Sequence, residues 1–224
     1  EWPLAKSAGA EEEIARADRP AVRFFVLGRK TSAEPLAEPE GRWSVCTPET
    51  AGRFSAAAYY FAVETSAKLK IPIGVIQNAY GGTPAEAWTP VEAIRANPDL
   101  AIVEARWARV MAEYPEKKAE FDAAIARWEK EAEAAKAEGK QPPARPRPPT
   151  APDGPNAPGA LYNALVAPLL PFPIRGVLWY QGESNAGRAA EYPSLLGTMI
   201  RSWRTAWGDQ ELPFFQVQLA GFMP

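Results

Sequence analysis

The sequence predicts an α/β protein built on a doubly wound parallel sheet. Short apolar runs rich in β-branched and aromatic residues alternate with amphipathic stretches of helical length, and the connections between the runs are long enough for crossover helices. At 224 residues the chain is long enough for one sizeable core. We therefore expect a single domain over residues 1–224, with a helical arm and a proline-rich linker inserted over residues 91–150.

Composition narrows the functional classes. The 25 basic and 27 acidic residues give a net charge of −2, which offers no electrostatic basis for binding nucleic acid or an anionic membrane. The single cysteine, Cys46, excludes an internal disulfide and a cysteine-built metal cluster. No apolar stretch approaches the roughly 20 residues that span a bilayer. The chain has no histidine, so the commonest general base at neutral pH is missing.

The first third of the chain predicts two strands before a helix. Residues 1–20 are irregular and mostly polar, residues 21–27 form a strand, and residues 42–45 form a short edge strand. Thr47 predicts a helix start, because a hydroxyl cap is followed by proline and an early acid. The stripe that we expect this helix to bury comprises Phe54, Ala57, Ala58, Phe61, Thr65 and Leu69. Residues 72–80 predict the next strand.

Residues 91–150 differ in character from the rest. Apolar residues recur at spacings of three and four over 100–114 and again over 121–135, with Pro115 between them. That pattern predicts two helices in an αα-hairpin. Residues 139–149 are rich in proline and predict an extended return linker, although a proline-rich ligand for another domain has the same composition. The 100–135 arm is a candidate surface for homo-oligomerisation, a candidate lid, or a purely structural element.

The last third returns to the α/β pattern. Residues 160–169 predict a helix that ends at its proline, and residues 176–180 predict a buried strand. Residues 191–207 form a strongly amphipathic helix with Gly208 as its stop signal. Residues 212–219 predict a final strand.

Two motifs follow predicted strands and should share one crevice. In doubly wound sheets, sites form beyond the carboxyl ends of strands. The Gly81-Gly82 turn follows one strand, and a polar cluster from Gln181 follows another. A backbone N–H of the glycine turn and the Gln181 amide suit an oxyanion hole, in which fixed donors stabilise charge on a carbonyl oxygen during acyl transfer. A plain tight turn and an ordinary polar loop are the simpler alternatives.

Neighbouring residues have less specific roles. Glu183 is suited to orienting a base or binding substrate, and Asn185 to holding the loop or donating to substrate. Trp88 either walls a pocket or fills the core. Ser184 is not expected to be a nucleophile, because Gly-Glu-Ser-Asn-Ala is not the Gly-x-Ser-x-Gly elbow and no histidine is present to activate it.

Three blocks together resemble the sialate O-acetylesterase family, a branch of the SGNH (GDSL-like) hydrolases. They are residues 78–88, 161–164 and 179–186, and residues 54–56 and 72–76 also match that family. The resemblance covers most of the chain except the arm. It implies a three-layer α/β/α fold and a serine esterase that removes O-acetyl groups from sugars such as sialic acid or acetylated plant polysaccharide. It also implies a periplasmic or secreted protein without metal or organic cofactor.

The resemblance assigns roles to individual residues. It implies Gly81 as the backbone oxyanion donor, Gln181 as the side-chain donor and Glu183 as a supporting residue. The substrate-binding residues that it implies are Gly82, Thr83, Trp88 and Asn185.

The resemblance also implies that the catalytic nucleophile and base lie outside this chain. In the family, the nucleophile belongs to a Gly-Gln-Ser-Asn-Met phrase that is followed by Glu-Trp-Pro, and this chain begins with Glu1-Trp2-Pro3. The family's histidine belongs to a carboxyl-terminal Asp-x-x-His-type segment. We therefore expect an internal fragment, truncated at both ends and inactive by itself.

Two other classes of protein fit parts of the sequence. A non-catalytic carbohydrate-binding or structural protein could derive from the same fold. An interaction protein organised by the 100–135 arm would form dimers that depend on that arm.

Overall fold

The computed structural model describes residues 2–221, so Glu1 of the opening motif lies outside the described residues. Its first sheet has the strand order β2-β1-β3. β1 (Arg19–Leu27) pairs in parallel with β3 (Ile73–Gln77) and antiparallel with β2 (Gly41–Cys46). The α/β class is confirmed. The antiparallel pair departs from the expected parallel sheet, because the connection 28–40 contains no helix and returns directly to the neighbouring strand.

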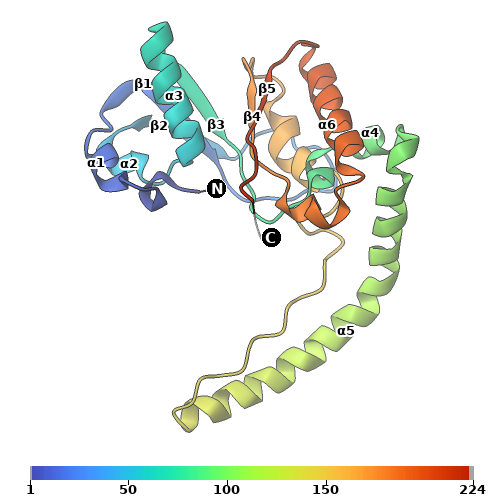
Figure 1. Cartoon of the computed structure of the whole chain (residues 1–224). Coiled ribbons are helices and arrows are strands. Elements are labelled where there is room, and N and C mark those ends of the chain that lie inside the picture. The colour runs from blue at the N-terminus through green and yellow to red at the C-terminus, as the bar shows by residue number, and fades with distance from the viewer. Residues whose placement is uncertain (1, 222–224) are drawn as a thin grey trace.

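Two further strands form a second sheet. β4 (Val177–Trp179) and β5 (Phe214–Gln216) pair in parallel, with Val177 opposite Phe214. Within the described residues these strands pair only with each other. Figure 1 shows the two sheets side by side.

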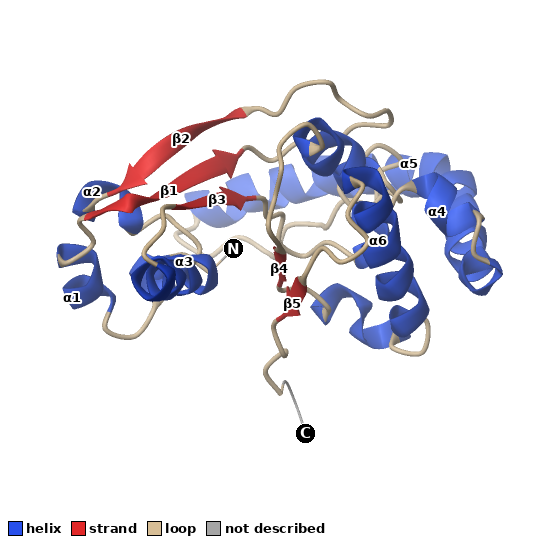
Figure 2. Cartoon of the chain, turned by 90° about the horizontal axis from the view of Figure 1, so that it is seen from above, coloured by secondary structure: helices blue, strands red, loops and turns tan. Residues whose placement is uncertain are grey.

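β1 divides the core into two clusters because its side chains alternate between faces. Val22 and Phe24 enter one cluster, and Leu27 enters the other. Phe24 stacks on Phe54 with ring centroids 4.0 Å apart. The helices of the first cluster are α1 (Ala10–Ala15), α2 (Pro48–Ala51) and α3 (Ala56–Leu69), preceded by a 3-10 turn (Leu4–Lys6). Figure 2 shows α1 and α3 below the first sheet.

The predicted helix after Thr47 is in fact two helices. Thr47 caps α2 as expected, but the helix stops at Ala51. Ser55 then caps α3, its hydroxyl accepting a hydrogen bond from the Ala58 N–H at 3.5 Å. This break changes the helical phase, so the predicted stripe is partly wrong: Phe61 is 40% exposed and Leu69 60% exposed. The residues that α3 buries are Ala56, Tyr59 and Ala62. The helix α1 was also missed, since residues 1–20 were expected to be irregular.

The second cluster is built around tryptophans. α6 (Tyr192–Trp207) buries Leu195, Met199 and Trp203 and ends at Gly208, whose φ of 67° is left-handed as a glycine stop requires. Trp179 lies edge-on to Trp88 and Trp203, with centroid separations of 6.2 and 6.0 Å. Short elements complete this cluster: 3-10 turns at Ala85–Trp88, Pro98–Leu100 and Ala167–Leu169, α4 (Val91–Arg95), and a π-helical turn at Tyr162–Val166. The predicted 160–169 helix is therefore irregular, with its proline inside the last turn.

The arm is a single 37-residue helix, α5 (Ala101–Ala137), and the predicted αα-hairpin is wrong. Pro115 costs one backbone hydrogen bond but does not end the helix. Strong helix formers surround it, and ion pairs one turn apart join Lys117 to Glu113 and Lys118 to Asp122. Figure 1 shows α5 projecting from the rest of the molecule, with an extended chain leading back.

The proline-rich linker is the second limb of this arm. Residues 140–150 contain neither helix nor strand, as predicted. The Trp128 indole N–H donates to the Pro143 carbonyl at 2.8 Å, and the Arg145 guanidinium lies over the Trp128 ring, 5.5 Å from its centroid. The apolar seam of α5 is thus covered at Trp128 by the chain's own return. Across residues 2–221, no helix combines the length and apolar character needed to cross a membrane.

Candidate functional site

The loops that follow β3 and β4 meet, as the two sequence motifs predicted. The Gln181 Nε2 donates to the Thr83 carbonyl at 3.2 Å, and the Asn185 Oδ1 accepts from the Ala85 N–H at 2.9 Å. The two contacts join segments about a hundred residues apart in the chain. They bring the glycine turn and the polar cluster to one edge of the molecule.

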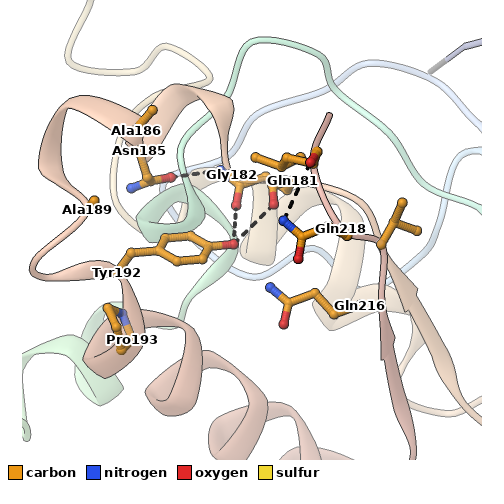
Figure 3. Close-up of a pocket in the computed structure, with 11 residues that line it drawn as sticks. Gln181, Gly182, Asn185, Ala186, Ala189, Tyr192, Pro193, Gln216 and Gln218 are labelled. Atoms are coloured by element: carbon orange, nitrogen blue, oxygen red, sulfur yellow. Dashed lines mark hydrogen bonds between the residues drawn. The ribbon is translucent and has the colours of Figure 1, made fainter. Parts of the chain in front are cut away.

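Both ends of the Gln181 amide are occupied. Its Nε2 also donates to the Asn185 Oδ1 at 2.7 Å, so both amide hydrogens have protein acceptors. Its Oε1 lies 3.0 Å from the Tyr192 hydroxyl, which is also 3.1 Å from the Gln181 carbonyl (Figure 3). As an oxyanion donor, Gln181 would have to redirect one hydrogen from Thr83 or Asn185 toward substrate.

Tyr192 was expected only as an inward-facing residue of its helix. Burial raises the pKa of the Tyr192 phenol, an effect that Glu183 adds to and the Trp179 indole opposes. The hydroxyl therefore stays protonated and has one hydrogen to share between the Gln181 backbone carbonyl and the Gln181 Oε1. The helical stripe in the sequence gave Tyr192 a packing role and contained no signal for this second one.

Asn185 and Glu86 form the buried centre of the site. Asn185 is 1% exposed, and its Nδ2 donates to the Glu86 Oε2 at 2.9 Å. The Glu86 Oε1 in turn accepts from the Arg188 Nη2 at 2.8 Å. Sequence reasoning missed Glu86; the available signal was a lone carboxylate in the otherwise apolar turn Ala85–Trp88.

Thr83 and Trp88 face the interior. The Thr83 hydroxyl donates to the Tyr80 carbonyl at 2.6 Å and accepts from the Trp88 indole N–H at 3.0 Å. The Trp203 indole N–H donates to the Trp88 carbonyl at 2.9 Å. Of the two alternatives for Trp88, the structure shows a ring that fills the core. Both side chains fix the loop after β3.

The glycines of the two loops have different surroundings. Gly81 and Gly82 are exposed, and Gly82 has a φ of 75°. Gly182 is buried with a φ of 154°, and a Cβ there would lie 2.7 Å from the Leu219 Cδ1. A side chain at 182 would therefore displace the Leu219 side chain, which follows β5, and would be strained at this φ. Glu183 and Ser184 are exposed at the start of the following 3-10 turn (Glu183–Arg188).

An open cavity of about 390 Å³ adjoins the loop after β4 (Figure 3). Asparagine and glutamine amides and the Tyr192 hydroxyl supply its polar groups, and apolar side chains supply the rest. Its lining comprises Gln181, Gly182, Asn185, Ala186, Ala189, Tyr192, Pro193, Gln216, Val217, Gln218 and Leu219. Gln181 and Asn185 are thus the predicted site residues that line it. The other predicted ones, Gly81, Gly82, Thr83, Trp88 and Glu183, are outside its lining.

A second cavity of about 420 Å³ lies where β1 and β3 end. Leu27 and Gln77, the last residues of those strands, line it together with Lys6 and Arg29. Within residues 2–221, no group of three or more Asp, Glu, Cys or His side chains is arranged to hold a metal ion.

Comparison with known proteins gives concordant matches. The family described as carbohydrate esterase, sialic acid-specific acetylesterase, matches residues 157–223. The sialate O-acetylesterase of Rattus norvegicus is 29% identical over 218 residues, which is 90% of this chain and 38% of that protein. The Homo sapiens enzyme is 27% identical over 200 residues, which is 84% of this chain and 30% of that protein.

A solved structure agrees with these matches. The crystal structure of a carbohydrate acetylesterase from Xanthomonas citri resembles this chain with a TM-score of 0.70 and 30% sequence identity. The match covers 98% of this chain and 38% of that one. The chain therefore spans little more than a third of the length of the Rattus norvegicus protein and of the Xanthomonas citri structure.

Proposed function

We propose that this chain, whose sequence and structure support the sialate O-acetylesterase family, supplies the oxyanion-binding part of a carbohydrate O-acetylesterase. The observation that carries the proposal is the junction of the two loops, in which Gln181 and Asn185 bond to Thr83 and Ala85. The junction holds an amide donor beside the Gly81-Gly82 turn. Hydrolysis of an acetyl ester places negative charge on the carbonyl oxygen, and such fixed donors stabilise that charge.

The reaction that we propose is a two-step acyl transfer. A serine activated by a histidine attacks the acetyl carbonyl, the Gly81 N–H and the Gln181 amide bind the oxyanion, and water then releases acetate. The histidine is assigned to sequence beyond this chain, because the 224 residues contain none. The serine is assigned there too, since Ser184 is an exposed residue of a 3-10 turn without a base. Glu183 is retained as a supporting residue.

The cavity beside Gln181 is the proposed site for the sugar. Gln216 and Gln218 offer amide donors and acceptors, which match the hydroxyl groups of a pyranose, and the Tyr192 ring and Pro193 offer apolar surface. Its volume of about 390 Å³ lies within the usual range for small-molecule sites.

We propose different roles for most of the residues that were predicted to bind substrate. We assign Asn185 to orienting Gln181, and Thr83 and Trp88 to holding the loop after β3, because their polar atoms bond to protein groups. Gly82 is exposed in this loop and remains a candidate for contact with the substrate through its backbone.

A non-catalytic carbohydrate-binding protein is the second candidate. It is favoured by one specific observation, namely that both Nε2 hydrogens of Gln181 already have acceptors within the protein. A binding protein needs no donor that turns toward a developing charge.

Acetate release across a panel of sugars separates the two candidates. The panel would contain O-acetylated sialic acid and acetylated xylan, tested with the product of the complete coding sequence and with the 224-residue chain. We expect the former to release acetate, the latter to release none, and Ser184→Ala to leave the former unchanged. Sugar binding without acetate release by either protein would favour the binding protein. Release by the 224-residue chain that Ser184→Ala abolishes would contradict the assignment of the nucleophile.

A further inference from the structure

Four charged side chains form a cluster behind the site. The Arg188 guanidinium contacts the Glu86 Oε1 at 2.8 Å and the Glu191 Oε1 at 3.1 Å. The Arg106 guanidinium contacts the same two oxygens at 2.9 Å from Glu191 and 3.9 Å from Glu86. The carboxylates are the more buried partners, with side chains 6% and 12% exposed. Two positive and two negative charges balance, as burial requires.

The cluster joins three segments that are distant in sequence. Glu86 lies in the turn after β3, and Arg188 and Glu191 lie between the loop after β4 and α6. Arg106 lies in the second turn of α5, at the base of the arm. The arm is therefore connected to the site by charge as well as by the chain.

We propose that Glu86 is a positioning residue that sets the direction of the Gln181 amide through Asn185, and that Arg106 of the arm helps to hold it. A carboxylate only accepts hydrogen bonds, so Asn185 must turn its Nδ2 toward the Glu86 Oε2, 2.9 Å away. Its Oδ1 then faces the Ala85 N–H and Gln181.

The same constraint passes on to Gln181. Because the Asn185 Oδ1 can only accept a hydrogen bond, Gln181 turns its Nε2 toward Asn185 and Thr83. The Gln181 Oε1 then faces the Tyr192 hydroxyl. Reversal of Asn185 would set its NH₂ against the Ala85 N–H and leave both without acceptors. The catalytic consequence rests on the proposed function, whereas the orientation does not.

The informative variant is Glu86→Gln, which keeps the shape and removes the charge. A glutamine offers either an oxygen or an NH₂ to Asn185, so only the Ala85 N–H still constrains the direction of that amide. The matched control is Glu104→Gln, which removes an exposed carboxylate of α5 that pairs with Arg95 at 2.9 Å.

Side-chain amide signals in a ¹⁵N–¹H NMR spectrum report the orientation without any need for activity. The signals of Gln181 and Asn185 would be assigned by their alanine variants in the 224-residue chain. We expect Glu86→Gln to shift or broaden both pairs, and Glu104→Gln to leave them in place. Unchanged signals in a folded Glu86→Gln chain would overturn the proposal.

Arg106→Gln gives a second route that leaves the Glu86–Arg188 pair intact, with Arg109→Gln of the same helix as its control. We expect Arg106→Gln to move the same amide signals by a smaller amount and Arg109→Gln not to move them. The Arg106→Gln and Arg109→Gln variants keep the test decisive if Glu86→Gln fails to fold. Unmoved Gln181 and Asn185 signals in folded Arg106→Gln would overturn the role of the arm.

In an active protein, the catalytic readout is a split between kcat and KM. We expect Glu86→Gln to lower kcat between about tenfold and 10²-fold with KM within about twofold, because a misdirected donor weakens transition-state binding. A KM effect with kcat unchanged would contradict a positioning role. If the product of the complete coding sequence releases no acetate while Glu86→Gln still shifts these amide signals, the proposed function fails and the positioning role stands.

Discussion

Amide direction is the residue-scale feature on which the site depends. Gln181 and Asn185 each have one donor end and one acceptor end, and each end faces a different protein group. Their place after a buried strand could be predicted from the sequence. The groups that orient them, Glu86 and Tyr192, could not, because they come from elements whose apolar pattern predicts packing alone.

Cys46 provides a residue-scale prediction about pH. Burial raises the pKa of the Cys46 thiol from 9.0 to about 11, although Arg19 lowers it in part. The folded chain therefore holds this proton more tightly than the unfolded chain does. Its stabilising contribution is complete below about pH 9 and is lost as the pH rises through about 11.

Urea unfolding at pH 8 and pH 10.5 measures this effect. We expect the midpoint of the unaltered chain to fall more over that interval than the midpoint of Cys46→Ala, which lacks the thiol. The Tyr59 phenol, whose pKa is also raised chiefly by burial, remains in both proteins, so the comparison removes that main part of its contribution. Equal falls in the two midpoints would show that the thiol does not contribute.

At the scale of elements, strands and helices with strong local sequence patterns were predicted correctly. The buried face of one helix and the length of another were not. β1, β3 and α6 have continuous apolar runs or clear caps, and their structures match. The helix after Thr47 was predicted with the wrong buried stripe because a second cap, Ser55, restarts the helix. The break expected at Pro115 does not occur, since the cost of one proline is offset along a helix of 37 residues.

Trp128 holds the two limbs of the arm, α5 and the proline-rich return segment, together. This contact provides a prediction at the scale of elements. Trp128→Ala removes the hydrogen bond to the Pro143 carbonyl and the ring under Arg145. We expect trypsin to cleave faster after Lys140, the basic residue of this segment that is not followed by proline, because the return segment is then released. Met111→Ala, at an exposed site of α5, is the control. The same cleavage rate in both variants would contradict a bracing role for Trp128.

Oligomerisation through residues 100–135 stays a prediction of the sequence pattern. The return segment covers the seam at Trp128, while Ile102 and Met111 remain exposed on the helix. Contact between copies through the arm would therefore use these exposed side chains or seam residues away from Trp128.

At the scale of the whole molecule, the two sheets share one apolar cluster, in which Leu27 of β1 lies with Trp179 of β4. The Phe61 ring of α3 lies 5.8 Å from the Phe215 ring of β5, and both side chains are largely exposed. Hydrogen bonds between the loops after β3 and β4 also join the part of the molecule around the first sheet to the part around the second sheet. The arrangement of these two parts could not be predicted from local patterns, because strand pairing depends on contacts between distant residues.

The most direct test of the central claim is the kcat of Gln181→Ala for an acetylated sugar, measured in the product of the complete coding sequence. Gln141→Ala, in the exposed return segment, is the control. Loss of one oxyanion donor predicts a fall in kcat on the order of 10²–10³-fold with little change in KM, and no change in the control. A folded Gln181→Ala protein with an unaltered kcat would contradict the claim that this amide stabilises the oxyanion.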